Sequence, residues 1–315
     1  MDRLEAMSIL IAAVEAGSLS AASRKLGTPL PTVSRKVSEL ESRLNTRLLV
    51  RSTRKLSLTD AGVAYLAACK RILEQVEEAE RAASGEYIAP RGELIVTAPI
   101  AFGRLHVQPL VNEFLAIFPD VNIRLVLSDR NAHLFDEHID LAVRIGALPD
   151  SSMVATRVGS VRRVVCGSPQ YFAGRGIPKT PKDLSAHAAV TFDILESTTF
   201  WNFFEPGSKV PQSVPIHSRL SVNLAQAAIE AAIAGVGMTR VFSYQAAQAI
   251  EDRTLEIVLT AFEPEPVPIN LVHAGQGLLP LKMRSFLDFM VPRLRTRLAL
   301  PVLDKSKSRK AQISP

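Results

Sequence analysis

The chain has 315 residues, of which 47% are hydrophobic, and it carries a formal net charge of +6 at pH 7. This length and apolar content predict two or three domains with large cores, and no segment approaches the roughly 18 uncharged apolar residues of a membrane-spanning helix. The two cysteines, Cys69 and Cys166, match no metal-ligand spacing. Two isolated cysteines are typical of a protein with free thiols in a reducing cytoplasm rather than of a disulfide framework. No metal or cofactor is expected.

The N-terminal segment is predicted to form an amphipathic helix rather than a signal peptide. Its apolar residues follow helical spacing, and Glu5 and Glu15 interrupt the apolar stretch. The apolar positions are Leu4, Met7, Leu10, Ile11 and Val14.

Two helical patterns separated by a turn follow this segment. The first ends at Gly27, which can take the left-handed conformation that closes a helix. Residues 28–31 read Thr-Pro-Leu-Pro and predict a turn, and the second helix is expected from Thr32 to Leu44. One face of it is predicted to be buried and consists of Val33, Val37, Leu40 and Leu44. This pattern is typical of a helix-turn-helix whose second helix presents its N-terminal half to the DNA major groove.

Basic residues are concentrated in the same region. Residues 24–55 contain nine Lys and Arg against two Glu, a local net charge of +7, so the rest of the chain is nearly neutral. A basic module attached to a near-neutral body is what phosphate contact by a single domain requires. We therefore predict that residues 1–60 form a DNA-binding domain.

A basic hairpin and a long helix are predicted next. Residues 48–51 and 56–58 are two short apolar strands around a basic tip, the pattern of the wing in a winged helix-turn-helix. Arg54 at this tip is placed to enter a narrow minor groove of DNA. Thr59 is the expected N-cap of a helix that runs over residues 60–84.

The long helix carries an apolar seam with a heptad period. The seam consists of Tyr65, Cys69, Ile72, Val76, Ala79 and Ala83. Such a period favours pairing with a second copy of the helix, and a dimer would set the spacing of two recognition helices on DNA. The alternative is that the stripe packs on the chain's own body. Residues 61–90 are thus predicted to be a linker and dimerisation segment ending in a hinge.

Beyond residue 90, strand and helix patterns alternate, which predicts a mostly parallel sheet covered by helices. The first strands are expected at 94–97, 121–127 and 141–146, with a helix over 99–118. A polar helix is expected to carry His133 and His138, which we interpret as exposed helix residues rather than metal ligands.

The body is predicted to have two lobes. Residues 91–165 and 267–298 form lobe I and residues 166–262 form lobe II, so the chain crosses twice between them. Ligands of open α/β sheets bind outside the carboxyl ends of the strands, so a cleft between the lobes is the expected ligand site. Residues 299–315 are basic and lack an apolar period, and we expect a disordered tail there.

Residues 21–62 carry a set of motifs that is characteristic as a whole. They contain small residues, Leu-Gly, Pro-x-Val-Ser-Arg, Leu-Glu-x-x-Leu, Arg-Leu-Leu-x-Arg and Leu-Thr-x-x-Gly. Weaker motif matches follow later in the chain. Taken together, the chain resembles LysR-type transcriptional regulators over essentially its whole length. The resemblance implies an α/β multidomain fold with an N-terminal winged helix-turn-helix, a long linker (dimerisation) helix and a C-terminal two-lobed, periplasmic-binding-protein-like effector domain.

The resemblance also implies contact residues. DNA contacts would fall on Leu30, Pro31, Thr32, Ser34, Arg35 and Lys36, with Arg54 at the wing. Effector contacts would fall on Thr97, Pro99, Ile100, Ala101, Ser128, Arg144, Ile145, Gly146, Asn223, Gly237 and Met238. The helix expected near Pro99 would aim backbone N–H groups at an anion such as a carboxylate. Where the family commonly has Ser or Thr followed by Gln, this chain has Pro29 and Leu30, so a polar cap and an amide that reads bases are missing.

The predicted function is sequence-specific regulation of transcription under the control of a small-molecule effector. The expected partners are an interrupted inverted repeat of double-stranded DNA, the effector and further copies of the chain, as a dimer, tetramer or larger ring, with RNA polymerase as a candidate. One alternative is regulation through cysteine redox chemistry. The other is an α/β enzyme that binds a small molecule, but the sequence holds no Gly-x-Ser-x-Gly, His-Glu-x-x-His, P-loop or Gly-x-Gly-x-x-Gly motif.

Overall fold

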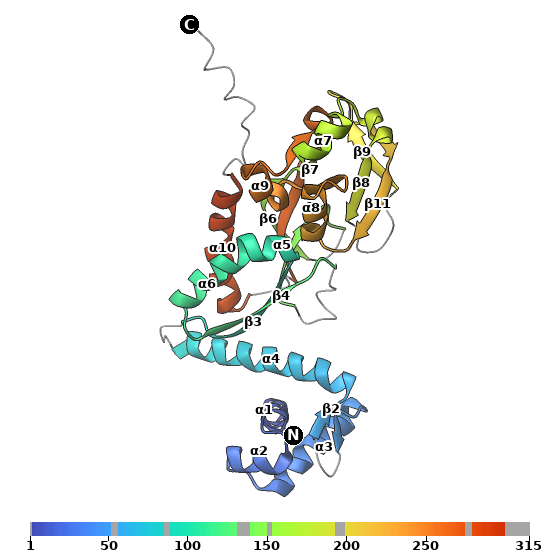
Figure 1. Ribbon diagram of the computed structural model, residues 1–315. Coiled ribbons are helices and arrows are strands. Elements are labelled where there is room, and N and C mark those ends of the chain that lie inside the picture. Colours follow the sequence, from blue (N-terminus) through green and yellow to red (C-terminus); the bar gives the residue numbers. More distant parts are fainter. Residues whose placement is uncertain are drawn as a thin grey trace. The chain divides into compact units, whose positions relative to one another are not determined.

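The computed structural model describes residues 2–51, 56–84, 89–130, 139–149, 153–192, 199–274 and 279–299. The chain forms two compact units, Met1–Pro90 and Arg91–Pro315 (Figure 1). Among the described helices none alone is long and apolar enough to cross a membrane; only the bent pair Arg3–Glu15 and Leu19–Leu26 reaches that length and composition together.

The first unit is a winged helix-turn-helix followed by a long helix. Its elements are α1 (Arg3–Glu15), α2 (Leu19–Leu26), α3 (Leu30–Leu44), β1 (Leu49–Arg51), β2 (Leu56–Leu58) and α4 (Asp60–Ser84). The Ser18 hydroxyl caps α2 by accepting the N–H of Ala21, and Gly27 closes α2 with a φ of 63°, as predicted. The core includes Leu10, Ala13, Ala22, Val33, Val37, Leu40, Leu48 and Cys69.

Helix α3 begins earlier than predicted. Leu30 rather than Thr32 is its first residue, so Leu30 and Pro31 belong to the first turn of the helix instead of the preceding loop. Proline is tolerated there because the N–H groups of a first turn have no partner inside the helix. The predicted apolar stripe is buried except at Leu44, which is 37% exposed because the helix ends there.

Helix α4 begins where it was predicted, and its first turn is tied to the wing. The Thr59 hydroxyl accepts the N–H of Gly62 (2.9 Å) and donates to the carbonyl of Arg47 (2.7 Å). A Cβ at Gly62 would lie 2.0 Å from the carbonyl oxygen of Leu48, so only glycine permits this close approach of α4 to the chain entering β1. Strands β1 and β2 pair antiparallel, which confirms the hairpin.

The seam predicted along α4 divides into two parts. Cys69 is fully buried in the core of its own unit, and the half-buried Tyr65 packs against the same core. This finding corrects the role of Cys69, because its side chain has no surface left for a partner helix. The second part, which consists of Ile72, Val76, Ala79 and Ala83, is half-buried or exposed, and its role in dimerisation stays a prediction.

The second unit contains two five-stranded sheets, and we call the part around the first of them lobe I. Its strands lie in the order β4 (Val121–Leu127), β3 (Gly92–Ala98), β5 (Leu141–Ile145), β14 (Val267–His273) and β6 (Val154–Val161). Strand β3 is parallel to β4 and β5, whereas β14 is antiparallel to β5 and β6, so the sheet is mixed rather than mostly parallel. In place of the single helix expected over 99–118 there are α5 (Ile100–Phe102), a π-helical turn (Gly103–Val107) and α6 (Gln108–Ile117). The closing helix α10 (Leu281–Ala299) packs near α6 (Figure 1).

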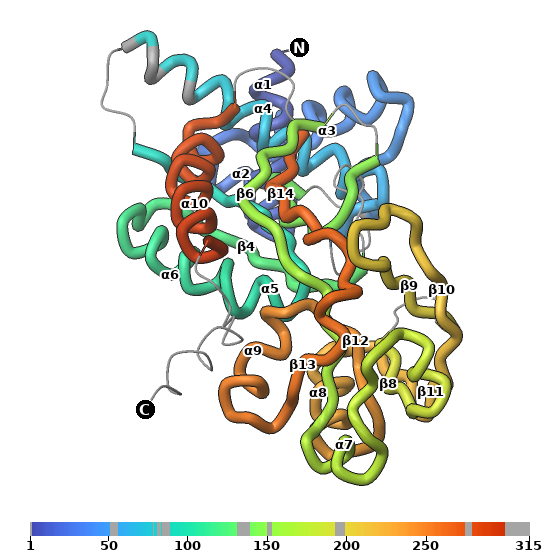
Figure 2. The backbone as a smooth tube through the Cα atoms, turned by 90° about the horizontal axis from the view of Figure 1, so that it is seen from above, coloured from blue at the N-terminus to red at the C-terminus, as the bar shows by residue number. Residues whose placement is uncertain are grey.

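Lobe II surrounds the other sheet. Its strands lie in the order β11 (His217–Val222), β8 (Ala188–Phe192), β12 (Met238–Phe242), β7 (Arg163–Gly167) and β13 (Glu256–Val258). Strand β8 is parallel to β11 and β12, and β7 is antiparallel to β12 and β13. The lobe also contains α7 (Pro169–Arg175), α8 (Ala225–Ile233), α9 (Ser243–Glu251), a hairpin of β9 (Phe200–Phe204) and β10 (Pro211–Pro215), and short 3-10 turns at Pro181–Ala186 and Thr260–Phe262 (Figure 2).

The chain passes from lobe I to lobe II at Arg162 and returns near Glu263. Strand β6 ends at Val161 and β7 begins at Arg163, so the first crossover lies at Arg162 rather than after residue 165 as predicted. The Arg162 guanidinium donates two hydrogen bonds of 2.8 Å to the Glu263 carboxylate. This bidentate pair ties the two crossover segments to each other.

Candidate DNA-binding face and ligand cavity

The N-terminal half of α3 presents an outward face above a buried stripe. Val33 and Val37 are fully buried, which fixes how the helix is rotated on its unit. Leu30 is 41% exposed although it is apolar. The predicted DNA contacts that are exposed or half-buried on this face are Leu30, Pro31, Thr32, Ser34 and Arg35. A fixed helix with an accessible N-terminal half is the geometry with which helix-turn-helix proteins enter the major groove.

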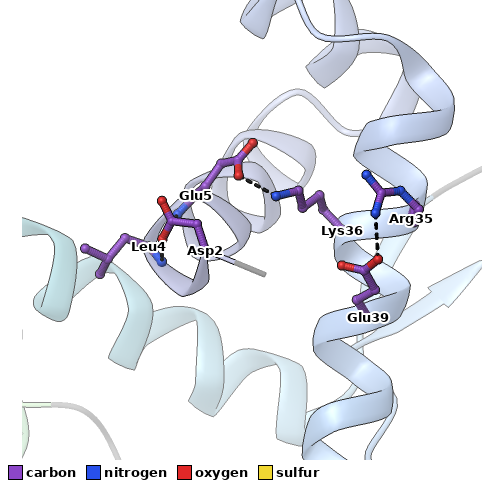
Figure 3. A network of polar contacts seen from close by, with 6 residues as sticks. All are labelled: Asp2, Leu4, Glu5, Arg35, Lys36 and Glu39. Carbon is purple, nitrogen blue, oxygen red and sulfur yellow. Dashed lines mark hydrogen bonds and ion pairs between the residues drawn. The ribbon is translucent and has the colours of Figure 1, made fainter.

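The two basic side chains at the front of α3 have different partners (Figure 3). Arg35 Nη1 lies 2.8 Å from Glu39 Oε1 one turn along the same helix, and 62% of the Arg35 side chain is exposed. An exposed pair of this kind contributes only about 0.3–0.5 kcal/mol, so Arg35 can exchange it for DNA at little cost. Lys36 Nζ instead contacts the Glu5 carboxylate on α1, and only 13% of its side chain is exposed. Lys36 therefore fastens α3 to α1, a role that the sequence prediction did not include.

The start of α3 lacks a polar cap, as the Pro29-Leu30 departure predicted. Pro29 occupies the N-cap position and its side chain makes no capping hydrogen bond. Polar side chains at this position usually contribute about 1 kcal/mol to a helix, so the first turn of α3 depends on tertiary packing. The remaining predicted contact, Arg54, lies at residues 52–55 outside the described part of the chain.

Three of the eight predicted effector positions in lobe I make hydrogen bonds within the fold itself. Thr97 is 2% exposed, and its hydroxyl donates to the carbonyl of Val126 (2.9 Å). The Ile100 N–H, expected to face an anionic ligand, donates to Asp129 Oδ1 (3.0 Å), so a carboxylate of the protein occupies that place and corrects the prediction. The Ser128 hydroxyl accepts a backbone N–H two residues on. The other predicted effector positions of lobe I are half-buried and lie at the carboxyl ends of β3 and β5. They are Pro99, Ala101, Arg144, Ile145 and Gly146.

The predicted effector positions in lobe II are not brought together. Asn223 follows the carboxyl end of β11, whereas Gly237 precedes the amino end of β12. Both strands are parallel to β8, so the two residues lie at opposite edges of the sheet. A Cβ at Gly237 would lie 2.5 Å from the Ala188 carbonyl oxygen, and Met238 is 1% exposed in the core of lobe II. Gly237 and Met238 are therefore corrected from ligand contacts to packing positions.

A cavity of about 190 Å³ lies instead at the carboxyl ends of β8 and β12. This is the edge at which open α/β sheets bind ligands. Its described lining residues are Arg163, Val190, Thr191, Phe192, Trp201, Arg240, Val241, Phe242 and Gln245. The cavity lies within lobe II, so residues from one lobe can hold a ligand there.

Arginine and aromatic side chains are paired in this cavity. The Arg163 guanidinium carbon lies 5.0 Å from the ring centroid of Phe242, and that of Arg240 lies 5.4 Å from the ring of Trp201. Arg240 Nη1 also donates to the carbonyl of Asn202 (3.2 Å). These cation–π contacts hold both guanidinium groups against aromatic rings.

Phe242 connects the cavity to lobe I. Its ring stacks on that of Tyr244, with centroids 6.0 Å apart and an angle of 12° between the planes. Tyr244 is 5% exposed and packs into the core of lobe I, where its ring meets Phe102 at 5.5 Å and His106 at 5.6 Å. Burial lowers the pKa of His106 and raises that of Tyr244, so both side chains are neutral near pH 7. Phe242 therefore belongs both to the wall of the cavity and to a contact between the lobes.

The two thiols that the redox alternative requires are poorly suited to that chemistry. Burial raises the pKa of the Cys166 thiol to about 12, and burial also raises the pKa of Cys69. The thiolate is the reactive form of cysteine, so neither thiol is suited to redox sensing. His133 and His138 lie outside the described residues, and within the described part of the chain no three His, Cys, Asp or Glu side chains gather as a metal ion would require.

Sequence reasoning missed Arg163, Trp201 and Arg240, the charged and aromatic residues of the cavity. Two signals were available. Arg163 and Arg240 each interrupt an apolar strand, and such positions are rarely charged unless the charge has a partner or a role. Trp201 is the single tryptophan of the chain and is 3% exposed. Neither signal indicates that the three residues lie together.

These features define a class of protein, in which a winged helix-turn-helix, a long helix and a two-lobed α/β ligand domain follow each other. Two family models match this division: residues 4–63 match the bacterial regulatory helix-turn-helix protein of the lysR family, and residues 89–295 match the LysR substrate binding domain. The chain belongs to the LysR family of transcriptional regulators.

Similar proteins agree with this assignment over nearly the whole chain. An HTH-type transcriptional regulator of Xanthomonas campestris pv. campestris (strain 8004) is 37% identical over 290 residues, 91% of this chain and 84% of that protein. The structure of CrgA, a LysR-type transcriptional regulator from Neisseria meningitidis, has a TM-score of 0.59 at 28% identity and covers 92% of this chain and 98% of CrgA. The full-length Vibrio cholerae virulence activator AphB has a TM-score of 0.58 at 26% identity, over 92% of this chain and 99% of AphB. The chain is thus a DNA-binding transcriptional regulator with a C-terminal effector-binding domain, and the family hits are to regulators rather than enzymes.

Proposed function

We propose that the protein binds an interrupted inverted repeat of double-stranded DNA as a homodimer and that a small-molecule effector changes this binding. The observation that carries the proposal is the exposed front of α3 above its buried stripe. In this position Arg35 binds the O6 and N7 atoms of a guanine, a contact that discriminates by about 1–3 kcal/mol. Leu30 offers apolar contact to a thymine methyl group, and Ser34 serves a base or a phosphate.

The distal half of α4 supplies the contact with a second copy. Ile72 is 39% exposed, and it begins the part of the seam that does not pack in the core of its own unit. Pairing along this face buries an apolar residue that is otherwise in water and places two α3 helices on one DNA molecule. The proposal also includes assembly of two such dimers into a tetramer or a larger ring, and contact of the protein with RNA polymerase.

The effector acts on this assembly through the second unit. A ligand changes DNA binding only as far as it binds one arrangement of the assembly better than another. The two crossover segments, held by the pair of Arg162 and Glu263, are where the arrangement of the lobes is set. We propose that the ligand shifts the two lobes relative to each other at these segments, and that this shift changes the affinity for DNA.

Selection from a random library of DNA duplexes by the purified full-length protein tests the proposal. We expect an inverted repeat whose half-sites are separated by about one helical turn, 10–10.5 base pairs, or a multiple of it. Ile72→Glu should weaken dimerisation and binding to the full repeat, while Val63→Glu is the matched control because Val63 is 50% exposed on the opposite face of α4. Enrichment of single half-sites, or an Ile72→Glu dimer as stable as that of the wild type, would contradict it.

A further inference from the structure

We propose that Glu41 positions the wing for DNA binding by fixing the hairpin of β1 and β2 to the recognition helix α3. The inference rests on the proposed function, because it names a positioning residue of the same DNA-binding face. Glu41 lies in the C-terminal half of α3 and is half-buried. Through this residue, α3 and the wing meet DNA as one surface.

The first step is that Glu41 holds the start of the wing with both its side chain and its backbone. Its Oε1 atom accepts the N–H groups of Leu48 (2.8 Å) and Leu49 (3.0 Å). Its carbonyl accepts the N–H of Thr46 (3.1 Å), at the turn that ends α3. Hydrogen bonds to a charged acceptor are stronger than those between neutral groups, so this one residue fixes the path of the chain from α3 into β1.

The second step is that the hairpin leaves the N–H of Leu49 without a partner inside the ladder. The N–H of Thr59 donates to the carbonyl of Leu48 (3.0 Å), and the next pair in the register is Leu49 with Leu58. Hydrogen-bonded and non-hydrogen-bonded pairs alternate in an antiparallel ladder, so the N–H of Leu49 points away from β2. Leu49 is 3% exposed, and a buried N–H needs an acceptor. Glu41 supplies that acceptor.

The third step is that the same segment is held from the other side by the start of α4. The carbonyl of Leu48 accepts the N–H of Thr59, and the Thr59 hydroxyl donates to the carbonyl of Arg47 (2.7 Å). Glu41 and Thr59 therefore clamp residues 47–49 between α3 and α4. Loss of the Glu41 side chain leaves the hairpin attached to α4 but no longer aligned with α3.

The fourth step is that the charge of Glu41 works against DNA binding. Glu39 and Glu41 are the two acidic residues within the basic stretch 24–55. A carboxylate in a module that contacts phosphates repels them, so its presence there indicates a structural task. Glu39 pairs with Arg35 on the same helix, whereas Glu41 binds the backbone at the start of the wing.

Two substitutions separate the hydrogen bonds of Glu41 from its charge. Glu41→Ala and Glu41→Gln both remove the negative charge, but glutamine keeps an oxygen that can accept the two N–H groups. Ser42→Ala, at an exposed neighbour on the same helix, is the matched control. The affinity of each full-length protein for the selected operator is measured with and without Arg54→Ala, which removes the predicted minor-groove contact of the wing. Hydroxyl-radical footprinting maps the DNA contacts that each protein makes.

We expect Glu41→Ala to bind about 10-fold more weakly and to lose the same footprint protections as Arg54→Ala. Glu41→Gln and Ser42→Ala should bind at least as tightly as the wild type. Because Glu41 acts through the wing, Glu41→Ala should cost no further affinity once Arg54→Ala is present, whereas a general loss of stability would add to it. If Glu41→Ala does not fold, Glu41→Asp replaces it with the same expected results, because its carboxylate is one CH₂ shorter and no longer reaches the two N–H groups.

Three results would overturn the inference. They are losses that multiply in the double variant, a Glu41→Gln protein as weak as Glu41→Ala, and an Arg54→Ala protein that binds as tightly as the wild type. If the wild type selects an operator and Glu41→Ala binds it equally well, the inference is wrong and the proposed function stands. If the wild type selects no operator, the proposed function fails and the inference fails with it.

Discussion

Replacing Gly62 by alanine tests how α4 is seated against the wing. In a helix alanine is favoured over glycine by about 1 kcal/mol, so helix propensity alone predicts a more stable protein. The new Cβ, however, would lie 2.0 Å from the Leu48 carbonyl oxygen and 3.0 Å from the Leu58 side chain. The nearest atom is backbone, and the same carbonyl accepts the N–H of Thr59 (3.0 Å). Relief requires a shift of backbone that costs about 2–3 kcal/mol, so we expect a net loss of about 1–2 kcal/mol.

Gly174→Ala is the matched control, because Gly174 lies in α7 and its Cβ would meet nothing within 4 Å. This change should stabilise the protein by about 0.5–1 kcal/mol. Urea denaturation followed by circular dichroism measures both variants, and hydrogen exchange assigns each change to its unit. Gly62→Ala should also weaken DNA binding, since Leu48 leads directly into the wing. A Gly62→Ala protein as stable as the wild type, beside a stabilised control, would refute the steric reasoning.

Three further predictions concern the second unit and the thiols. Met238→Ala should cost about 2–4 kcal/mol in thermal unfolding, because Met238 is 1% exposed in a core; a loss below about 1 kcal/mol would return it to the ligand site. Since burial raises the pKa of both Cys69 and Cys166, neither thiol should react with a disulfide reagent near pH 8 in the folded protein, and both should react in urea; fast labelling of the native protein would revive the redox alternative. Glu263→Gln should cost about 2 kcal/mol, because it leaves a half-buried guanidinium without its carboxylate, and the double variant with Arg162→Gln should lose less than the sum of the single changes.

Elements with strong local signals were predictable from the sequence. Gly27 marked the end of α2, Thr59 marked the start of α4, and the apolar run 121–127 coincides with β4. Each of these signals depends on residues within a few positions of one another, so no tertiary information was needed. The start of α3 was missed because Pro31 reads as a turn residue, although the first turn of a helix accepts it equally well.

The ligand cavity could not be predicted because its residues come from strands that are distant in the chain. Arg163 and Arg240 are brought together by the antiparallel pairing of β7 with β12, which no local pattern reveals. Lys36 illustrates the same limit on the DNA-binding face. Its type and position fit a phosphate contact, and only the packing of α1 against α3 shows that Glu5 binds it.

The central claim is that the front of α3 reads base sequence, and one comparison of affinities tests it directly. The ratio of affinities for the selected operator and for a duplex with one substituted base pair is measured for Arg35→Ala and for Arg43→Ala, an exposed arginine near the end of the same helix. Arg35→Ala should lower the free energy of discrimination that this ratio measures by about 1–3 kcal/mol. Arg43→Ala should lower both affinities equally and leave the ratio unchanged. An unchanged ratio in Arg35→Ala at every base pair tested would contradict the account.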